Sequence, residues 1–347
     1  MTEPIAYSPD ATEPVQRGTA HLIRRWVFRI SPWIVTVIAL YIAFNDVKWP
    51  VLFNHLGEAN PTFLLGAVLL TVCSYLMRSR RWQFLFPEKV MNFAYSGKVL
   101  ILGFFMNNIL PARAGEFVRA HMGAQVAGTT RTLVLATIAS ERLADGLMLS
   151  VMFVAFSFGV GNQDYSRNLF YVALLFGSAT IGVLLVLIFR SKIFSVGDRI
   201  NERINRKASK YAFDRLKIFI NGLSPLCTPS KAAVISLWTI VIWSIELCVY
   251  FCIAQAFDAS LSLPLCVLFL VAVNFSSLIP AAPGGLGVIE AVASAVLVSI
   301  GIPKEKALTM VLVQHVIQYL VVGIPGAVIM FTWKKQLKEL KRDDPTE

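Results

Sequence analysis

The sequence predicts an all-α polytopic membrane protein with about six full spans and two broken-helix hairpins. Of its 347 residues, 56% are hydrophobic and 15% are charged, whereas soluble domains average about 25% charged residues. Two short breaks, Pro111–Gly115 and Pro280–Gly284, lie about 169 residues apart and share Pro, Ala and Gly in the same register. Paired breaks in the two halves of a hydrophobic chain are typical of transporters built from repeats, with the binding site at the breaks.

Six apolar stretches approach or exceed the length of about 20 residues that spans a bilayer. They are residues 26–44, 62–76, 131–158, 168–189, 232–257 and 307–333. Residues 1–25 are polar and contain prolines without an apolar core, so we expect a cytoplasmic tail and not a signal peptide. Residues 334–347 form a second, basic tail.

Basic residues set the expected orientation, because loops rich in Lys and Arg stay in the cytoplasm. Both termini are therefore placed in the cytoplasm of a cell that carries this protein in its inner or plasma membrane. The cytoplasmic clusters are Arg17, Arg24, Arg25 and Arg29 at the N-terminal end of the first span; Arg78, Arg80 and Arg81 after the second; the loop 190–231; and the tail 334–347.

These anchors require an even number of crossings in each segment that holds a break. The apolar run 99–106 is too short for a span, so a re-entrant hairpin from the cytoplasm is expected. In the other half, 263–279 and 287–302 form either two near-complete crossings or a deep hairpin from outside. Irregular backbone at membrane depth needs protein or water around it, so the two breaks should face each other.

The two halves then read as inverted copies of one unit. The first repeat covers 62–158 and the second 232–333, inside a single transmembrane domain of residues 26–333. The alternative is a coincidence between two Pro-Gly turns.

Three ionisable residues stand inside the apolar stretch 131–158. Glu141 lies about 15 Å along a helix that starts at Arg131, and Arg142 and Asp145 follow within one turn. Ionisable residues at this depth usually mark a substrate pathway or a proton relay. The alternative is a structural ion pair between Arg142 and Asp145.

The first break carries polar and charged residues that suit an anion. Asn108 precedes it, and Arg113, Glu116 and Arg119 follow. A helix that starts near Ala114 would direct its N–H groups towards the break, and arginine binds phosphate oxygens in a bidentate manner. The alternative is that these charges only line a cytoplasmic loop.

The second break is nearly free of charge. It contains Pro280, Gly284 and Gly285, and the carboxylate of Glu290 follows in an apolar arm. Expected roles for Glu290 are counter-ion to an arginine of the first half or proton carrier. Asp145, Glu290 and His315 are the candidates for proton or ion coupling, although a lone membrane histidine is more often a hydrogen-bonded packing residue.

Several function classes are excluded by their missing motifs. The sequence has no Walker loop, no Cys/His metal spacing and no nucleophile elbow, so we predict no catalytic residues, no metal and no cofactor. The net charge of +11 comes from clusters between spans, so nucleic acid is not an expected partner. The five cysteines lie mostly in apolar segments and are expected to be structural.

The chain resembles the lysylphosphatidylglycerol synthase transmembrane-region family. Three motifs carry the resemblance: Asn108 to Glu116 with Arg119; Glu141-Arg142 with Asp145; and Pro280 with Pro283 to Gly287 and Glu290. In bifunctional members this region is the flippase half of an enzyme that also aminoacylates phosphatidylglycerol. Only a short basic tail follows Trp333 here, so synthase activity is not carried over.

The resemblance implies a lipid translocase that moves a polar, anionic phospholipid or related lipid across the membrane. The positions it implies for substrate are Arg113, Glu116, Arg119, Glu141, Arg142, Asp145 and Glu290, to which the breaks add Asn108, Pro280, Gly284 and Gly285. The alternatives are a membrane-embedded enzyme that uses Glu141 and Asp145 as acid and base, and a non-transporting partner of a separate lipid-modifying enzyme.

Overall fold

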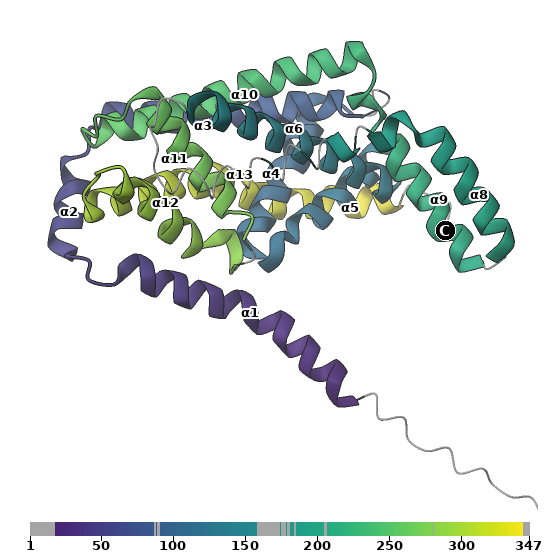
Figure 1. Cartoon of the computed structure of the whole chain (residues 1–347), viewed down its shortest axis with the longest axis horizontal. Coiled ribbons are helices and arrows are strands. Elements are labelled where there is room, and N and C mark those ends of the chain that lie inside the picture. Colours follow the sequence, from purple (N-terminus) through teal and green to yellow (C-terminus); the bar gives the residue numbers. More distant parts are fainter. Residues whose placement is uncertain are drawn as a thin grey trace, which may run out of the picture.

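The described part of the chain is helical throughout, with no strand. The computed structural model describes residues 18–86, 88, 91–157, 174, 178, 181–183, 185–204, 207–279 and 281–342. Long helices form the body of the molecule, and the hairpin of α8 and α9 lies at one end of it (Figure 1).

The described residues up to Ser157 form six α-helices and one short 3-10 helix. α1 packs along α12, and α2 packs against α13. Their bounds are α1 Gly18–Phe44, α2 Trp49–Glu58, α3 Pro61–Phe84, α4 Phe93–Ile109, η1 Pro111–Arg113, α5 Gly115–Ala127 and α6 Arg131–Ser157.

The second half repeats part of this order. Its elements are α8 Arg190–Ile204, α9 Lys207–Gly222, η2 Ser224–Leu226, α10 Pro229–Ala256, α11 Leu263–Ser276, η3 Pro283–Gly285, α12 Val288–Ser299 and α13 Lys304–Arg342.

Three helices of the described chain are long and apolar enough to cross a membrane. They are Pro61–Phe84, Pro229–Ala256 and Lys304–Trp333. A fourth span results if Ser31–Phe44 and Trp49–Glu58, which meet at 81°, count as one. The predicted count of six is not confirmed: α6 has 27 residues but carries charges in its middle, and most of the predicted span 168–189 lies outside the described residues.

Each break joins two short helices. α4 and α5 have 17 and 13 residues, and α11 and α12 have 14 and 12. At 1.5 Å per residue these helices are about 18 to 26 Å long, shorter than the roughly 30 Å hydrocarbon core of a bilayer. The arms of each hairpin pack on each other, as the sequence predicts.

The order helix, helix, 3-10 turn, helix, helix occurs twice, as α3 to α6 and as α10 to α13. Elements at the same place in the two orders also pack on each other: α3 packs against α10, and η1 packs against η3. Contacts of this kind are what a two-fold axis between repeats produces. The inverted orientation itself stays a prediction.

The basic segment 190–231 was expected to be a loop, but most of it is helical. Residues 190–204 and 207–222 form the helices α8 and α9, which pack against each other, and α9 also packs on α6. Lys217 bridges the two helices, since its Nζ lies 2.7 Å from Asp198 Oδ1. Amphipathic spacing of apolar residues between the basic ones explains why this segment folds as a helical pair.

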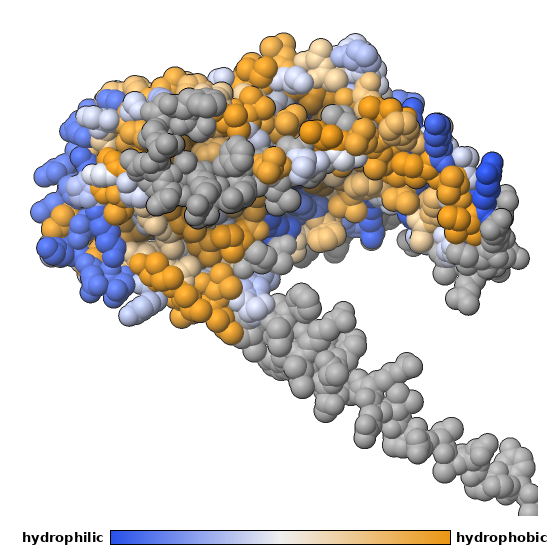
Figure 2. Space-filling view, viewed as in Figure 1, coloured by the Kyte–Doolittle hydropathy of each residue, from blue (hydrophilic) through white to orange (hydrophobic). Residues whose placement is uncertain are grey.

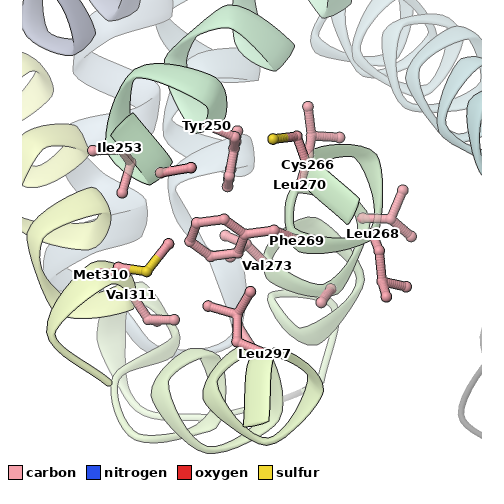
Figure 3. Packing of buried hydrophobic residues seen from close by; sticks show 14 of the residues in the cluster. Tyr250, Ile253, Cys266, Leu268, Phe269, Leu270, Val273, Leu297, Met310 and Val311 are labelled. Atoms are coloured by element: carbon pink, nitrogen blue, oxygen red, sulfur yellow. The ribbon is translucent and has the colours of Figure 1, made fainter. Parts of the chain in front are cut away.

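The largest hydrophobic core lies where α10, α11, α12 and α13 meet. Phe269 of α11 occupies its centre and contacts the ring of Tyr250 edge-on, with 4.8 Å between the ring centroids. Leu297 of α12 and Met310 and Val311 of α13 close the cluster around it (Figure 3). This packing fixes the second hairpin against α13.

Much of the outer surface is apolar. Large aliphatic and aromatic side chains such as Val37, Tyr41, Leu65 and Leu69 are more than half exposed. Figure 2 shows hydrophobic residues over much of one face, with hydrophilic ones gathered at the end where α2 lies. Soluble proteins rarely expose apolar patches this extensive, so this surface suits lipid.

Candidate functional site

A cavity of about 440 Å³ lies between the two breaks. Its wall comes from α3, α4, η1, α5, α6, α10, α11, η3, α12 and α13, so both halves of the chain contribute. The sequence prediction that the breaks face each other is therefore confirmed, since η1 also packs directly against η3. A volume of this size is within the range of small-ligand sites.

The first break depends on a close crossing of α4 and α5. A Cβ atom added to Gly115 would stand 2.2 Å from the carbonyl oxygen of Gly103 and 2.5 Å from the backbone nitrogen of Asn107. Only glycine lets α5 begin at this point. The crossing brings Glu116 of α5 and Asn107 and Asn108 of α4 to the cavity wall.

Arg113 occupies the turn between these helices. Its φ of 55° lies in the left-handed region, which non-glycine residues adopt at a cost of about 1–3 kcal/mol and mostly at functional sites. The side chain lines the cavity, and its Nη2 donates to Ser277 Oγ of the second hairpin at 3.3 Å. The strained turn thus directs a guanidinium group across to the second hairpin.

The second break is held from two sides. On one side, Thr36 of α1 accepts a hydrogen bond from the Ala282 backbone N–H at 2.8 Å and donates to the Leu286 carbonyl at 3.2 Å. On the other side, the Tyr319 hydroxyl of α13 donates to the Pro283 carbonyl at 3.2 Å. Gly284 has a φ of 70° between these contacts, a left-handed conformation that glycine adopts readily.

Asp145 is the most heavily bonded carboxylate of the cavity wall. Arg81 of α3 contacts both of its oxygens, at 2.5 and 3.0 Å, and the Trp243 indole N–H donates to it at 2.9 Å. Arg78 adds a contact of 3.5 Å. The negative charge of Asp145 on α6 is thus shared by two arginines of α3.

Arg78 also binds Glu246 of α10. Its Nη2 lies 3.1 Å from Glu246 Oε1, and Ser74 donates to the same oxygen at 2.6 Å. Arg78 and Arg81 are buried inside α3, so the expectation that they mark a cytoplasmic loop is wrong. They are structural charges of the site, which the apolar interior tolerates because each has a carboxylate partner.

Arg142 and Arg119 each take a different carboxylate. Arg142 Nε donates to Glu116 at 3.0 Å, whereas Arg119 grips both oxygens of Glu141, at 3.2 and 2.7 Å. The proposed alternative pairing of Arg142 with Asp145 is therefore wrong. Glu141 is fully buried and Arg119 nearly so, and neither lines the cavity.

Arg113 differs from the other arginines of the cavity. Within the described chain it forms no ion pair, and its side chain donates a hydrogen bond to the neutral hydroxyl of Ser277. The amide oxygen of Asn107, also at the cavity, is buried without a hydrogen-bond partner in the described chain. The cavity thus offers a free cation and a free acceptor to a ligand.

Glu290 and His315 form a separate pair beside the second break. Glu290 Oε2 accepts from the Gly287 backbone N–H at 2.7 Å, and Oε1 lies 2.6 Å from His315 Nδ1. His315 Nε2 lies 3.2 Å from the Gly284 carbonyl oxygen. One of the two roles expected for Glu290, counter-ion to an arginine, is therefore wrong, because its partner is His315.

The structure brings most of the predicted site residues to one place. Those at the cavity are Asn108, Arg113, Glu116, Arg142, Asp145, Gly284, Gly285 and His315. Arg119 and Glu141 lie behind it, Glu290 touches it only through His315, and Pro280 lies outside the described residues.

Sequence reasoning missed several cavity residues. These are Tyr75, Arg78, Asn107, Trp243, Asn274 and Ser277. A signal existed for Arg78, since Ser74 and Arg78 are one helical turn apart in an apolar helix that continues to Phe84. No group of three or more His, Cys, Asp or Glu residues in the described chain is placed to hold a metal ion.

Comparison with known proteins gives one family and a set of archaeal relatives. The family described as "Lysylphosphatidylglycerol synthase TM region" matches residues 28–326. A UPF0104 membrane protein of Pyrococcus horikoshii is 21% identical over 328 residues, which cover 87% of this chain and 96% of the relative.

Two further relatives come from Methanocaldococcus jannaschii, and both are described as UPF0104 membrane proteins. One is 23% identical over 90% of this chain and 95% of its own length. The other is 27% identical over 69% of this chain and 99% of its own length. The family match, residues 28–326, includes both breaks and every residue that lines the cavity.

Proposed function

The chain belongs to the lysylphosphatidylglycerol synthase TM region family of membrane proteins, and on that premise we propose that it translocates a polar, anionic phospholipid or related lipid across the cell membrane. The observation that carries the proposal is the cavity between the breaks, where Arg113 forms no ion pair with a carboxylate of the described chain. A phosphate group would supply the anion that this guanidinium lacks.

The balance of charge at the cavity supports an anionic ligand. Arg78, Arg113 and Arg142 line it together with Glu116, Asp145 and Glu246. Arg81 adds a positive charge directly behind Asp145. Four arginines against three carboxylates leave one positive charge unmatched at this wall, and that charge is at Arg113.

The size of the cavity suits a headgroup and not a whole lipid. An acyl chain spans about half of the 30 Å hydrocarbon core, or about 15 Å, and two such chains would not fit beside a headgroup in about 440 Å³. Leu278 and Ile279 line the cavity and are 40% and 44% exposed. These residues give the chains an apolar rim at which to stay in the bilayer.

The cavity is lined by residues of both halves of the chain, and this arrangement supports alternating access. Its two walls belong to separate repeats, which meet at η1 and η3. A rocking motion of one repeat against the other would open the cavity to one side at a time. With the cell interior negative, outward movement of one negative charge gains about 2.3 kcal/mol per 100 mV, so an anionic lipid needs no nucleotide.

The ion pairs favour translocation over acid–base chemistry. An enzyme using Glu141 and Asp145 would need at least one of them free to exchange a proton with a substrate. Glu141 is instead buried against Arg119, and Asp145 accepts from Arg81 and Trp243. The proposed translocase keeps these carboxylates as fixed charges.

The proposed orientation places both termini in the cytoplasm. The basic pair α8 and α9 would then lie at the cytoplasmic face, where anionic headgroups attract Lys and Arg. The first break would face the cytoplasm, so Arg113 would meet a lipid of the inner leaflet.

The test is translocation in reconstituted vesicles. Vesicles of phosphatidylcholine with a small share of NBD-labelled phosphatidylglycerol are prepared with and without the protein, and dithionite is added outside. We expect the protein to expose inner-leaflet label to quenching, and an Arg113→Ala, Arg142→Ala double variant to lose this activity.

The matched control is Arg80→Ala, because Arg80 is exposed on α3, contacts Gln83 and Phe84 of the same helix, and does not line the cavity. Translocation at equal rates in the wild type and the double variant would overturn the proposal. A modified lipid found by mass spectrometry, without movement of label, would favour an enzyme instead.

A further inference from the structure

The pair formed by Glu290 and His315 holds the second break to the neighbouring helices. Glu290 is the third residue of α12, and its carboxylate caps the Gly287 N–H at the start of that helix. His315 belongs to α13 and reaches both this carboxylate and the Gly284 carbonyl oxygen of the break. One side chain thus ties α12, α13 and η3 together.

The number of protons in this arrangement follows from its acceptors. The Gly284 carbonyl can only accept, so His315 Nε2 must carry a hydrogen to bond it at 3.2 Å. Nδ1 and Glu290 Oε1, 2.6 Å apart, must share a further proton, whichever atom carries it. The pair as it stands therefore holds one proton more than a carboxylate beside a neutral imidazole.

Loss of that proton would break one of the two contacts. A neutral imidazole has a single N–H, and the negative Glu290 carboxylate is the stronger acceptor for it. Nε2 would then turn its lone pair towards the Gly284 carbonyl, and two acceptors at 3.2 Å repel each other. The break would keep Tyr319 and Thr36 but lose its tether to His315.

We infer that Glu290 and His315 form a proton-binding site that couples proton uptake and release to movement of the second break. His315 lines the cavity, so the proton exchanges with water there, and no other reactant is needed. The inference rests on the proposed translocation, whose cycle requires the second break to move.

Asp145, the third candidate from the sequence, does not fit this role. Its two oxygens accept three hydrogen bonds from Arg81 and Trp243, and Arg81 is fully buried. A proton on Asp145 would leave that guanidinium without its counter-ion, at a cost of several kcal/mol. Coupling is thereby assigned to one pair.

Other titratable and charged groups lie near the Glu290–His315 pair, at the cavity wall. On its own helix, the Tyr319 ring meets the His315 ring edge-on, with 4.8 Å between centroids. The remaining titratable and charged groups that face the cavity are Tyr75 and Arg78 of α3, Arg113 of η1, Glu116 of α5, Arg142 and Asp145 of α6, and Glu246 of α10. Each carboxylate among them is paired with arginine.

The experiment compares pH profiles of lipid translocation. Wild type, His315→Gln and Tyr319→Phe are reconstituted in phosphatidylcholine vesicles with NBD-labelled phosphatidylglycerol, at equal pH inside and outside, from pH 5.5 to 9. We expect the wild-type rate to change by about tenfold per pH unit beyond the pH at which the pair loses its proton. We expect the His315→Gln rate to be flat.

Tyr319→Phe is the matched control, because it removes the other α13 tether of the break without removing a group that titrates in this range. Its rate is expected to differ from wild type while its pH profile keeps the wild-type shape. A flat wild-type profile, or a wild-type profile in His315→Gln, overturns the coupling and leaves translocation standing. No translocation in wild type at any pH overturns the proposed function and the coupling with it.

A second readout does not depend on transport. Deuterium uptake by peptides that cover residues 281–289 is compared in wild type and His315→Gln at matched pH. We expect several-fold slower uptake in wild type at pH 6 and equal uptake at pH 9. Equal uptake by wild type and His315→Gln at both pH 6 and pH 9 would contradict the inference that His315 holds the second break.

Discussion

Arg113 of the first break donates a hydrogen bond to Ser277 of the second hairpin, with 3.3 Å between Nη2 and Oγ. These residues are 164 positions apart, and their contact joins the two halves of the chain across the cavity. The bond is neutral on the side of the serine, so it leaves the positive charge of Arg113 available. A lipid phosphate entering the cavity would replace this hydroxyl as the stronger acceptor.

The first prediction concerns lipid selectivity. Arg113→Gln keeps a donor for Ser277 but removes the charge, and a charge-assisted hydrogen bond is worth about 1.5–3 kcal/mol. We expect the preference for NBD-labelled phosphatidylglycerol over NBD-labelled phosphatidylcholine to fall by about tenfold or more. The two rates are measured in the same vesicles by dithionite quenching. An unchanged ratio would show that Arg113 does not read the phosphate charge.

The second prediction separates the buried arginine from the cavity arginine. Arg119 stacks on Trp82, with 4.1 Å from its central carbon to the ring centroid, and pairs with the fully buried Glu141. Arg119→Met leaves Glu141 with only the 3.9 Å contact to Arg142, so we expect a loss of about 3–5 kcal/mol of folding stability.

Thermal unfolding in detergent measures this loss. The double variant Arg119→Met, Glu141→Gln should recover most of it, because no buried charge is left unpaired. If the single variant unfolds at the wild-type temperature but transports poorly, Arg119 contacts substrate instead.

The third prediction tests the crossing of α4 and α5. Gly115→Ala places a Cβ atom 2.2 Å from the Gly103 carbonyl oxygen, and the two helices must move apart. We expect about 1–3 kcal/mol of destabilisation, together with reduced translocation because Arg113 shifts.

Gly323→Ala is the matched control. Gly323 lies within α13, and an added Cβ meets nothing within 4 Å. Its unfolding temperature should stay at or slightly above that of the wild type, because alanine favours a helix. Equal effects of the two substitutions would contradict the close crossing.

The fourth prediction concerns the hold of α1 on the second break. Thr36 is 6% exposed and bonds both Ala282 and Leu286. Thr36→Val leaves a buried N–H and a carbonyl without this partner, which costs about 1–3 kcal/mol. Thr36→Ser keeps the hydroxyl and should retain most of the stability. Hydrogen exchange at the Ala282 N–H should become faster in the valine variant and not in the serine variant. Equal exchange rates in both variants would show that Thr36 of α1 does not hold the second break.

The sequence alone determined the all-helical class, the family and the places where helices break. Helix length and apolar content are local properties, and Pro and Gly act on their own backbone, so a Pro-Gly pair predicts a break wherever it occurs. The contact between η1 and η3 followed because irregular backbone at membrane depth needs protein or water beside it. The helices of the basic segment 190–231 were not predicted. Its many Lys and Arg residues indicated a cytoplasmic loop, and the amphipathic spacing of its apolar residues was not considered.

Only the tertiary structure decided which charges belong together. Arg142 and Asp145 are one turn apart on α6, yet Arg142 pairs with Glu116 of α5 and Asp145 with Arg81 of α3. Partners of this kind come from different helices, and their pairing depends on how the helices rotate and cross, which local spacing does not encode. The same holds for Arg113: its sequence marks it as one arginine among several, and the fold leaves it as the one in the cavity with no carboxylate partner in the described chain.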